Sequence, residues 1–193
     1  MNKQHCMMTK QNGFFGETPR EKCAVFGIYG KTLDAARLTY FGLYALQHRG
    51  QEASGISASD SNSLRTHKAQ GLVAQVYTEQ DLENLTGHMA IGHNRYSTSG
   101  GSISDHNQPV AGKNDIVALA HNGNLPSTIK LQNFLRKKGF DTNSLNDSEL
   151  MHLAIKYYLV KGLTLEGAIQ KAYPLFTGAF CLLVMTKDKI AAV

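Results

Sequence analysis

The sequence predicts one domain of the α+β class. Its 193 residues are enough to enclose a hydrophobic core, and 42% apolar with only 18% charged residues argues against a disordered chain. Segments with a strand pattern and segments with a helical pattern fall into separate groups along the chain. Such grouping indicates α+β layers, because a parallel sheet would require regular βαβ alternation.

The first half of the chain is predicted to form strands with helices between them. Residues 23–30 are a short apolar run that ends in glycine, as in a buried strand. Residues 33–47 repeat apolar side chains at the helical period, and strand-like segments follow at 54–58 and 64–67. Residues 72–85 are predicted to form one or two short helices.

The second half is predicted to contain four strands and three helices. Two apolar strands come first and are followed by amphipathic helices and then by a second pair of strands. In chain order they are strands 89–94 and 116–121, helices 127–138, 147–160 and 165–173, and strands 179–185 and 189–193.

The charge distribution does not favour a nucleic-acid partner. Lys and Arg number 20 against 15 Asp and Glu, a net charge of +5. The dense basic cluster Arg136-Lys137-Lys138 stands at the end of a predicted helix, where cations complement the helix dipole. Nucleic-acid binders usually show a broader basic surface with aromatic residues interleaved.

The sequence also gives no sign of a membrane partner or of secretion. It contains no apolar run of about 18 residues and no apolar core of a signal peptide near its N-terminus. Cys6, Cys23 and Cys181 are odd in number and irregularly spaced, which argues against disulfides and for a cytoplasmic location. Cys181 lies within an apolar segment and is predicted to be an inert, buried thiol.

Cys23 stands where the regular apolar pattern begins. Residues 1–22 are polar and sparsely patterned, so the folded unit could begin at Cys23 itself. A cysteine at the start of a strand is most often a small core residue. A functional role is favoured by three loops that combine glycine with polar side chains, at 46–56, 92–100 and 120–125.

Six ordered motifs extend from Cys23 to Glu149. They are CAVFGIYG, LQHRGQEASGI, GHNRYSTSG, QPV at 108–110, LAHNGNL, and NDSEL at 146–150. In these motifs the chain resembles the glutaminase domain of the glutamine phosphoribosylpyrophosphate amidotransferases (amidophosphoribosyltransferases), which are class II amidotransferases with an N-terminal nucleophile. The residues of the motifs RYSTSG and QHRGQE favour this family over other class II amidotransferases.

The resemblance implies how the chain is divided. Residues 1–22 are expected to be a propeptide that is removed by cleavage between Lys22 and Cys23. Residues 23–193 are expected to be a class II glutamine amidotransferase domain that is incomplete at its C-terminus. The phosphoribosyltransferase domain of the family is absent from this chain.

The resemblance also implies the catalytic groups. Cys23 is expected to be the nucleophile, and its own α-amine, freed by cleavage, is expected to be the general base. An α-amine titrates near pKa 7.7–8.0 and can therefore accept the thiol proton at neutral pH. Asn122 and Gly123 are expected to form the oxyanion hole, with the Asn122 side-chain amide and the Gly123 backbone N–H as donors.

Three residues are matched to groups that bind glutamine. Arg95 is expected to bind the α-carboxylate, Thr98 to add a hydroxyl contact and Asp147 to hold the α-ammonium. For Arg95 the alternative is a surface salt bridge. For the segment at Asp147 the alternative is an N-cap in Asn146-Asp147-Ser-Glu, and one segment can serve both purposes.

Arg49 and Gln51 are expected to shape the pocket near the nucleophile without contacting the substrate. No protein metal site is predicted, because the eight histidines include no H-E-x-x-H pair. No cofactor is expected within this chain. The resemblance implies Mg²⁺ and a 4Fe–4S cluster in the full-length enzyme, with the cysteine ligands of the cluster outside this sequence.

The resemblance finally implies a fold and a reaction. The expected fold is the four-layer α-β-β-α sandwich of the N-terminal nucleophile (Ntn) hydrolases. The expected reaction is hydrolysis of L-glutamine to supply ammonia, which converts phosphoribosyl pyrophosphate to 5-phosphoribosylamine in the first step of de novo purine synthesis. The full-length enzyme is expected to be a homotetramer. The alternatives are the glutaminase domain of another class II amidotransferase and an unprocessed, non-catalytic glutamine-binding domain.

Overall fold

The strands of the protein form two antiparallel sheets. The computed structural model describes residues 23–96 and 106–193, so the predicted propeptide and Thr98 lie outside the described residues. The four strands of sheet A are ordered β1-β4-β2-β3 and the three strands of sheet B are ordered β5-β6-β7. Sheet A contains β1 (Ala24–Tyr29), β2 (Ala53–Ser59), β3 (Leu64–Gln70) and β4 (Met89–Arg95). Sheet B contains β5 (Ala118–Asn124), β6 (Ala179–Met185) and β7 (Ile190–Ala192).

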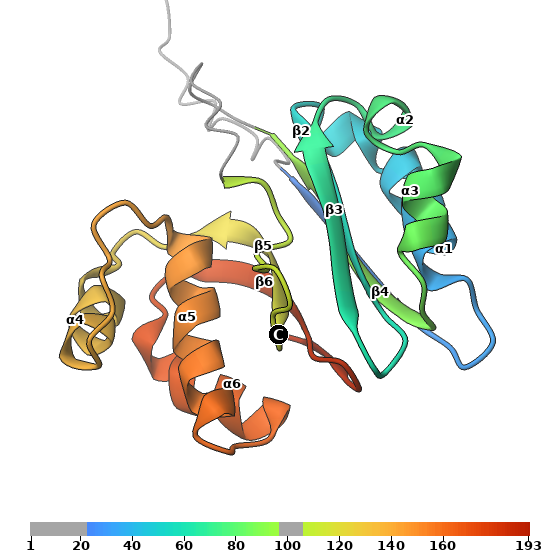
Figure 1. Cartoon of the computed structure of the whole chain (residues 1–193). Coiled ribbons are helices and arrows are strands. Elements are labelled where there is room, and N and C mark those ends of the chain that lie inside the picture. Colours follow the sequence, from blue (N-terminus) through green and yellow to red (C-terminus); the bar gives the residue numbers. More distant parts are fainter. Residues whose placement is uncertain (1–22, 97–105) are drawn as a thin grey trace, which may run out of the picture.

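Helices cover the outer face of each sheet, and the two inner faces are turned toward each other (Figure 1). On sheet A they are α1 (Ala35–Ala45), the 3₁₀ turn η1 (Gln47–Arg49), α2 (Val73–Val76) and α3 (Glu79–Asn84). On sheet B they are α4 (Ile129–Lys137), α5 (Asp147–Val160), α6 (Leu165–Ala172) and the 3₁₀ turn η3 (Tyr173–Leu175). Within the described ranges, none of these helices is long and apolar enough to pass through a membrane.

The predicted mixture of helices and antiparallel strands is confirmed, and the element order agrees with it. The segment 72–85 forms two helices because Tyr77 between them is extended and Thr78 starts a new N-cap. The Thr78 N–H donates to Asp81 Oδ2 at 2.9 Å while the Asp81 N–H donates to Thr78 Oγ1 at 3.2 Å. This reciprocal pair is a capping box, which favours helix initiation at that point.

Alternate residues of β4 point to opposite faces of sheet A, and both faces are buried. Ala90 belongs to the apolar cluster under α1, together with Leu43. Met89 and Ile91 belong to the cluster between the sheets, which also contains Ala118, Ala120 and Met185. A third cluster joins sheet B to α5 and α6. The end of β4 therefore delivers its odd-numbered side chains into the space between the sheets.

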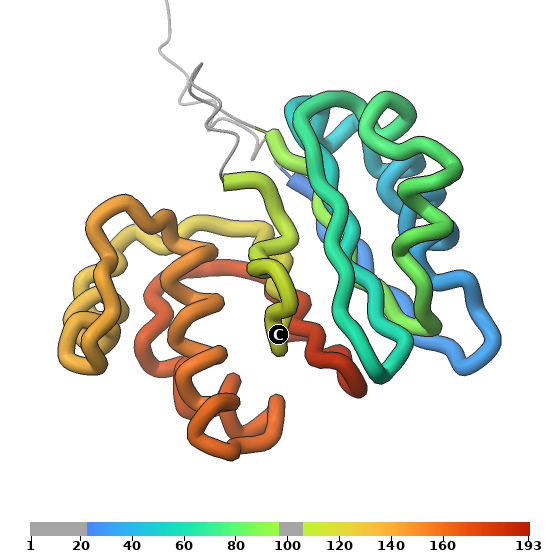
Figure 2. Tube along the Cα trace, viewed as in Figure 1, coloured from blue at the N-terminus to red at the C-terminus, as the bar shows by residue number. Residues whose placement is uncertain are grey.

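The chain that precedes β5 passes along sheet A before it joins sheet B (Figure 2). Lys68 Nζ on β3 donates to the Asn107 and Pro109 carbonyl oxygens at 2.6 and 3.1 Å. Val110 then pairs with Leu119 through two backbone hydrogen bonds of 2.7 and 3.0 Å. The segment thus connects the exposed edge of one sheet to the edge of the other.

A buried ion cluster fastens this segment to α5. Asp115 is 4% exposed, and its two carboxylate oxygens lie 2.9 Å from Lys156 Nζ and 3.3 Å from His152 Nε2. Burial raises the pKa of Asp115, but the hydrogen bonds from His152, Lys156 and the Gly112 N–H lower it more, so the net pKa lies well below the usual range. The carboxylate is therefore ionised at neutral pH and stabilises the fold.

Asp115→Asn is expected to lower the free energy of unfolding at pH 7 by about 2–4 kcal/mol, because it leaves Lys156 and His152 without their buried partner. Since the folded pKa is depressed, the contribution of Asp115 is present above its unfolded pKa of about 3.9 and is lost as pH falls below that value. Urea unfolding at pH 7 and below pH 4 measures both effects. Glu166→Gln is the matched control, because the Glu166–Lys189 pair is exposed to solvent and should contribute much less to stability. Equal effects of the two variants would contradict the prediction.

Candidate active site

Arg49 contacts the main chain of Cys23 at both its N–H and its carbonyl oxygen. The Cys23 N–H donates to the Arg49 carbonyl oxygen at 3.1 Å, and Arg49 Nε donates to the Cys23 carbonyl oxygen at 3.0 Å. Cys23 has φ +62°, which non-glycine residues seldom adopt. Such a conformation persists only where the surrounding contacts fix it. The turn η1 therefore sets the position of the predicted nucleophile.

The Cys23 thiol lies against the end of β4. The Tyr96 N–H donates to Cys23 Sγ at 3.4 Å, and Sγ lies 3.8 Å from the Tyr96 carbonyl oxygen. Burial raises the pKa of the Cys23 thiol, although the Tyr96 N–H and the positive charge of Arg95 lower it in part. Glu52 adds a smaller increase. The thiol is consequently protonated at neutral pH and needs a base before it can attack a substrate.

Gln47 and Gly50 fix the loop that carries Arg49. Gln47 Nε2 donates to the Gly50 carbonyl oxygen at 2.5 Å, and Gln47 Oε1 accepts from the Val73 N–H at 2.7 Å. A Cβ on Gly50 would lie 2.7 Å from the Asn94 carbonyl carbon, so only glycine allows the loop to approach β4 this closely. Gln51 is exposed. The side chain that supports the loop is thus Gln47, which sequence reasoning missed.

A cavity of about 170 Å³ lies beside Cys23. Its lining residues are Ala24, Val25, Leu46, Arg49 and Asn122. Arg49 reaches it from η1, and Asn122 reaches it from sheet B. The predicted support residue and one predicted oxyanion donor, which are far apart in the sequence, therefore meet at one cavity next to the predicted nucleophile.

Arg95 ends β4 and is paired with Glu52. Arg95 Nε lies 3.9 Å from Glu52 Oε2, and the Glu52 N–H donates to the Arg95 carbonyl oxygen at 3.1 Å. Both side chains are mostly buried, with 19% and 21% exposed. Glu52 Oε2 itself accepts no hydrogen bond from any residue that the structure describes. The alternative of a surface salt bridge therefore does not describe Arg95, whose carboxylate partner lies in a largely enclosed setting.

Asn122 faces the space between the sheets. Side chains 118 and 120 of the same strand belong to the inter-sheet cluster, and the period of two along a strand puts Asn122 on that face. Asn122 pairs directly with Cys181 of β6. Cys181 is exposed, so the prediction of a buried thiol is wrong. The apolar run around Cys181 does not indicate burial because one end of β6 extends beyond the packed part of the sheet.

Gly123 lies on the free edge of β5. The Leu119 main chain pairs outward with Val110, and the His121 main chain pairs outward with the Gln108 side chain. Since main-chain groups alternate in direction along a strand, the Gly123 N–H is expected to point to this same edge. Gly123 has φ +152°, and a Cβ there would lie 2.7 Å from the Ala179 carbonyl oxygen. Glycine is therefore required at this position.

Asp147 joins the first turn of α5 to the end of β5. Asp147 Oδ2 accepts from the Leu125 N–H at 3.2 Å, and Oδ1 accepts from the Ser148 N–H at 2.8 Å. The N-cap of α5 is Asn146, whose Oδ1 accepts from the Glu149 N–H at 2.9 Å. The capping alternative is therefore correct for Asn146, and the Asp147 carboxylate, with 24% of its side chain exposed, contacts β5 instead.

His121 connects β5 to the first turn of α5. His121 Nδ1 lies 2.9 Å from Ser148 Oγ and 3.9 Å from Asp147 Oδ2, while His121 Nε2 is buried and has no hydrogen-bond partner within the described part of the chain. Burial lowers the pKa of His121, and the nearby charge of Asp147 opposes that shift. The ring therefore links the strand that carries Asn122 to the helix start that carries Asp147.

The structure brings Cys23, Arg49, Arg95 and Asn122 to neighbouring strand and loop ends and places Asp147 on the opposite face of β5. The roles of these residues, and that of Gly123, stay predictions. Sequence reasoning missed the contacts of Gln47, His93, Tyr96, Gln108 and His121. All five lie inside or beside the quoted motifs, which was the only available signal.

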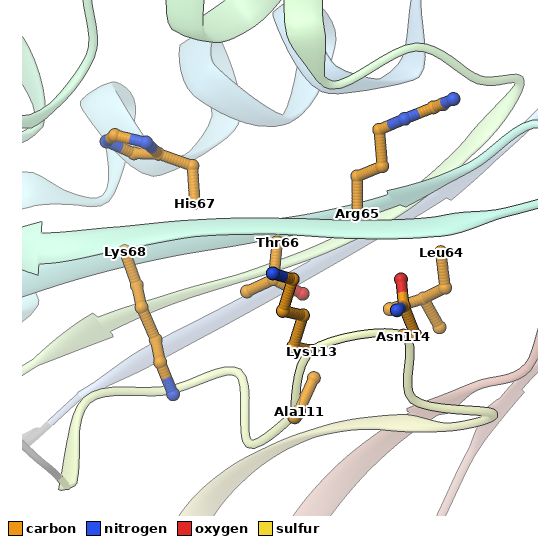
Figure 3. A pocket seen from close by; sticks show the side chains of 9 residues that line it. Leu64, Arg65, Thr66, His67, Lys68, Ala111, Lys113 and Asn114 are labelled. Atoms are coloured by element: carbon orange, nitrogen blue, oxygen red, sulfur yellow. The ribbon is translucent and has the colours of Figure 1, made fainter.

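A second cavity of about 520 Å³ lies between β3 and residues 111–114 (Figure 3). Lys68 and Thr66 point from β3 toward this loop, whereas Arg65 and His67 point to the other side of the strand. Its lining includes none of the predicted catalytic or glutamine-binding residues. This cavity therefore lies apart from the candidate active site.

The described residues do not contain a metal site for the cofactors expected of the full-length enzyme. Within 23–96 and 106–193, no three or more His, Cys, Asp or Glu side chains gather as metal ligands. The donor set of these described residues thus fits neither Mg²⁺ nor a 4Fe–4S cluster.

Comparison with curated proteins finds similar sequences over most of the chain. No protein-family model matches it. An amidophosphoribosyltransferase of Synechococcus elongatus is 42% identical over 176 residues, which are 90% of this chain and 36% of that protein. An amidophosphoribosyltransferase of Bacillus subtilis is 39% identical over 173 residues, 88% of this chain and 36% of that protein. The chain thus spans about a third of the length of the curated relatives that it matches.

Solved structures show the same relationship. The structure described as that of the allosteric regulatory enzyme of purine biosynthesis superposes with a TM-score of 0.77 at 38% identity and covers 88% of this chain and 36% of that one. A glutamine phosphoribosylpyrophosphate amidotransferase from B. subtilis, solved with ADP and GMP, superposes with a TM-score of 0.74 at 37% identity and equal coverage.

These matches place the chain in the class of the glutamine amidotransferases. Within that class, it is a homologue of the amidophosphoribosyltransferases over about 90% of its own residues and spans about a third of the length of those enzymes. The resemblance seen in the sequence motifs is confirmed.

Proposed function

We propose that this chain is the glutaminase part of an amidophosphoribosyltransferase and that Cys23 is its nucleophile. The observation that carries the proposal is that Arg49, which holds the partly buried Cys23, and Asn122 line one cavity beside it. The family of the relatives supports the class of reaction. The raised pKa of the thiol is compatible with the role only if a base lies close to Cys23, and the α-amine of Cys23 meets that requirement.

Cleavage after Lys22 would turn the Cys23 N–H from an amide into an amine. The amine would take the thiol proton, and Sγ would attack the side-chain carbonyl carbon of glutamine. The C–N bond would break as the proton passes from the amine to the leaving ammonia. Water would then hydrolyse the thioester, which releases glutamate and restores the thiol. Before cleavage the amide nitrogen cannot accept a proton, so the precursor is expected to be inactive.

The oxygen that becomes negative in the tetrahedral intermediate requires donors at about 2.7–3.1 Å. The Asn122 side chain faces the inter-sheet space and borders the cavity, and the Gly123 N–H is expected at the free edge of β5. These positions support the proposed oxyanion hole. Arg95 is proposed to bind the α-carboxylate, with Thr98 beside it, and Asp147 is proposed to bind the α-ammonium.

The broader setting is also part of the proposal. The apolar cluster between the sheets supports a four-layer sandwich of the Ntn type, with helices outside two facing sheets. Ammonia from this domain would act on phosphoribosyl pyrophosphate in the rest of the enzyme, where Mg²⁺ and a 4Fe–4S cluster would lie. Both described cysteines are free, in keeping with a cytoplasmic location. The homotetramer stays a prediction.

Arg95→Lys is expected to raise KM for glutamine about tenfold with a smaller change in kcat. A lysine cannot offer the two parallel N–H groups that a guanidinium offers to a carboxylate. Steady-state glutaminase kinetics measure the effect. Arg37→Lys is the matched control, because Arg37 pairs with Asp34 on an exposed face of α1. An unchanged KM in Arg95→Lys would remove Arg95 from the proposed substrate contacts.

The maturation step tests the proposed function. One protein begins at Cys23 after removal of an initiator methionine, and its matched control carries a single alanine before Cys23. Intact-mass measurement verifies each N-terminus, and glutamate release measures activity. We expect hydrolysis from the first protein and none from the second, because the second has an amide at Cys23. Hydrolysis by both would contradict the α-amine as base, and glutamine binding without hydrolysis by either would favour the non-catalytic alternative.

A further inference from the structure

His93 is buried between the two sheets beside the candidate active site. It lies on β4 two residues before Arg95, on the same face of the strand, and it is 1% exposed. His93 Nε2 lies 3.2 Å from the carbonyl oxygen of His121 on β5. This contact crosses from sheet A to sheet B and ends on the residue that precedes Asn122.

Gln108 holds the same peptide segment from the free edge of β5. Gln108 Oε1 accepts from the His121 N–H at 2.6 Å, and Gln108 Nε2 donates to the His121 carbonyl oxygen at 3.3 Å. The side-chain amide therefore takes the place that a neighbouring strand would occupy. The His121 carbonyl receives two side-chain groups, from His93 and from Gln108, immediately before the predicted oxyanion donors.

The charge state of His93 is consistent with a fixed donor. Burial, with smaller contributions from the charges of His121 and Arg95, lowers the pKa of His93 to about 3, against the opposing effect of the bond to the His121 carbonyl oxygen. The imidazole is therefore neutral at physiological pH. A contact with a carbonyl oxygen requires the proton on Nε2, which leaves Nδ1 as an acceptor, and Nδ1 is buried with no partner among residues 23–96 and 106–193.

A buried polar atom without a partner costs roughly 1–3 kcal/mol. A leucine at this position would avoid that cost, so the histidine is expected to provide something that packing alone does not. The bond to His121 is the interaction it provides. Because no strand of the described residues pairs with this edge of β5 beyond Leu119, side chains must hold the main chain where Asn122 and Gly123 follow.

We propose that His93 and Gln108 are positioning residues, which fix the His121 peptide so that Asn122 and Gly123 are held in register as oxyanion donors. The inference rests on the proposed glutaminase function and extends it to two residues that do not contact the substrate. A displacement of about 1 Å in a catalytic group can cost about 100-fold in rate. The effect should therefore fall on the chemical step rather than on glutamine binding.

Four variants of the purified, processed protein test the inference: His93→Leu, His93→Gln, Gln108→Leu and His152→Leu. His152 is the matched control, because it is also buried and its Nε2 also contacts a backbone carbonyl, that of Val117, at 3.1 Å. Glutaminase kcat and KM are measured with thermal unfolding. Alkylation of Cys23 by iodoacetamide reports on the thiol alone, since it needs no oxyanion hole.

We expect kcat to fall about 10- to 100-fold in His93→Leu and Gln108→Leu, with KM and the alkylation rate within about threefold of wild type. His93→Gln should keep most of the activity, because its side-chain amide can donate to the same carbonyl. His152→Leu should unfold at lower temperature and keep its kcat while folded. If either leucine variant at 93 or 108 fails to fold, the other decides the outcome.

Wild-type kcat in a folded His93→Leu or Gln108→Leu protein would overturn the inference, as would an equal loss in His152→Leu. Failure of the proposed function gives a different result, namely wild-type hydrolysis in Cys23→Ala. The two outcomes are therefore distinguishable when Cys23→Ala is measured beside the four variants.

Discussion

Cys23→Ala is expected to abolish glutamine hydrolysis, with a loss in kcat of about 10⁴-fold or more. Alanine keeps the α-amine and the main-chain contacts with Arg49 but removes the sulfur that would form the thioester. The variant should begin at residue 23, so that the loss cannot be assigned to incomplete cleavage. Glutamate release measures the rate, and intact mass verifies the N-terminus.

Cys181→Ala is the matched control for this prediction. Cys181 is the other described cysteine, it is exposed, and it pairs with Asn122 across β5 and β6. Its removal should leave hydrolysis close to the wild-type rate. In the proposed complete enzyme, Cys23→Ala should still form 5-phosphoribosylamine from added free ammonia. Only the supply of ammonia from glutamine would be lost. Hydrolysis that persists in Cys23→Ala and disappears in Cys181→Ala would show that Cys181, and not Cys23, is the nucleophile.

Asn122→Ala is expected to lower kcat by about 10²–10³-fold, the usual cost of losing one oxyanion donor. KM should change little, because the donor acts on charge that develops in the transition state. Steady-state kinetics and a thermal unfolding curve measure the two properties. The folded state should be retained, since Asn122 is only partly buried and its strand is held by β6.

The control for this prediction lies two residues further along the same strand. Asn124 is exposed, and Asn124→Ala removes the same amide from the same face of β5 without reaching the cavity. Its kcat should remain within about twofold of wild type. A comparable loss in both variants would indicate damage to β5 rather than removal of an oxyanion donor.

The fold could be predicted well wherever the local pattern decides the structure. The motif at Asn146–Glu149 predicts the first residue of α5 correctly. Asn146 and Glu149 exchange side-chain and backbone hydrogen bonds within one turn, so the local sequence alone fixes this helix start. The strand at β5 continues to Asn124 although its last residues are polar, since pairing with β6 satisfies their main chain. No local pattern reports such pairing, so the predicted end of that strand was too early.

The candidate site was predictable only as far as motifs identify residue types. Cys23, Arg49, Arg95 and Asn122 lie close to one another, as the family resemblance implied. The contacts that position them depend on the approach of the two sheets. His93 and His121 are 28 residues apart in sequence and meet only because sheet A packs on sheet B. Side chains of this kind cannot be found from the spacing along one strand.

The contacts between Arg49 and Cys23 bear on the entropy of catalysis. The first residues of a chain are usually poorly ordered, and a catalytic amine at such an end would spend much of its time away from the reacting atoms. Here the residue that would become the N-terminus already has both its nitrogen and its carbonyl oxygen bound while it is still inside the chain. Its conformational freedom is therefore removed during folding, before the proposed cleavage would occur. The newly formed amine would already be oriented toward the thiol's surroundings, and each turnover would cost little further conformational entropy.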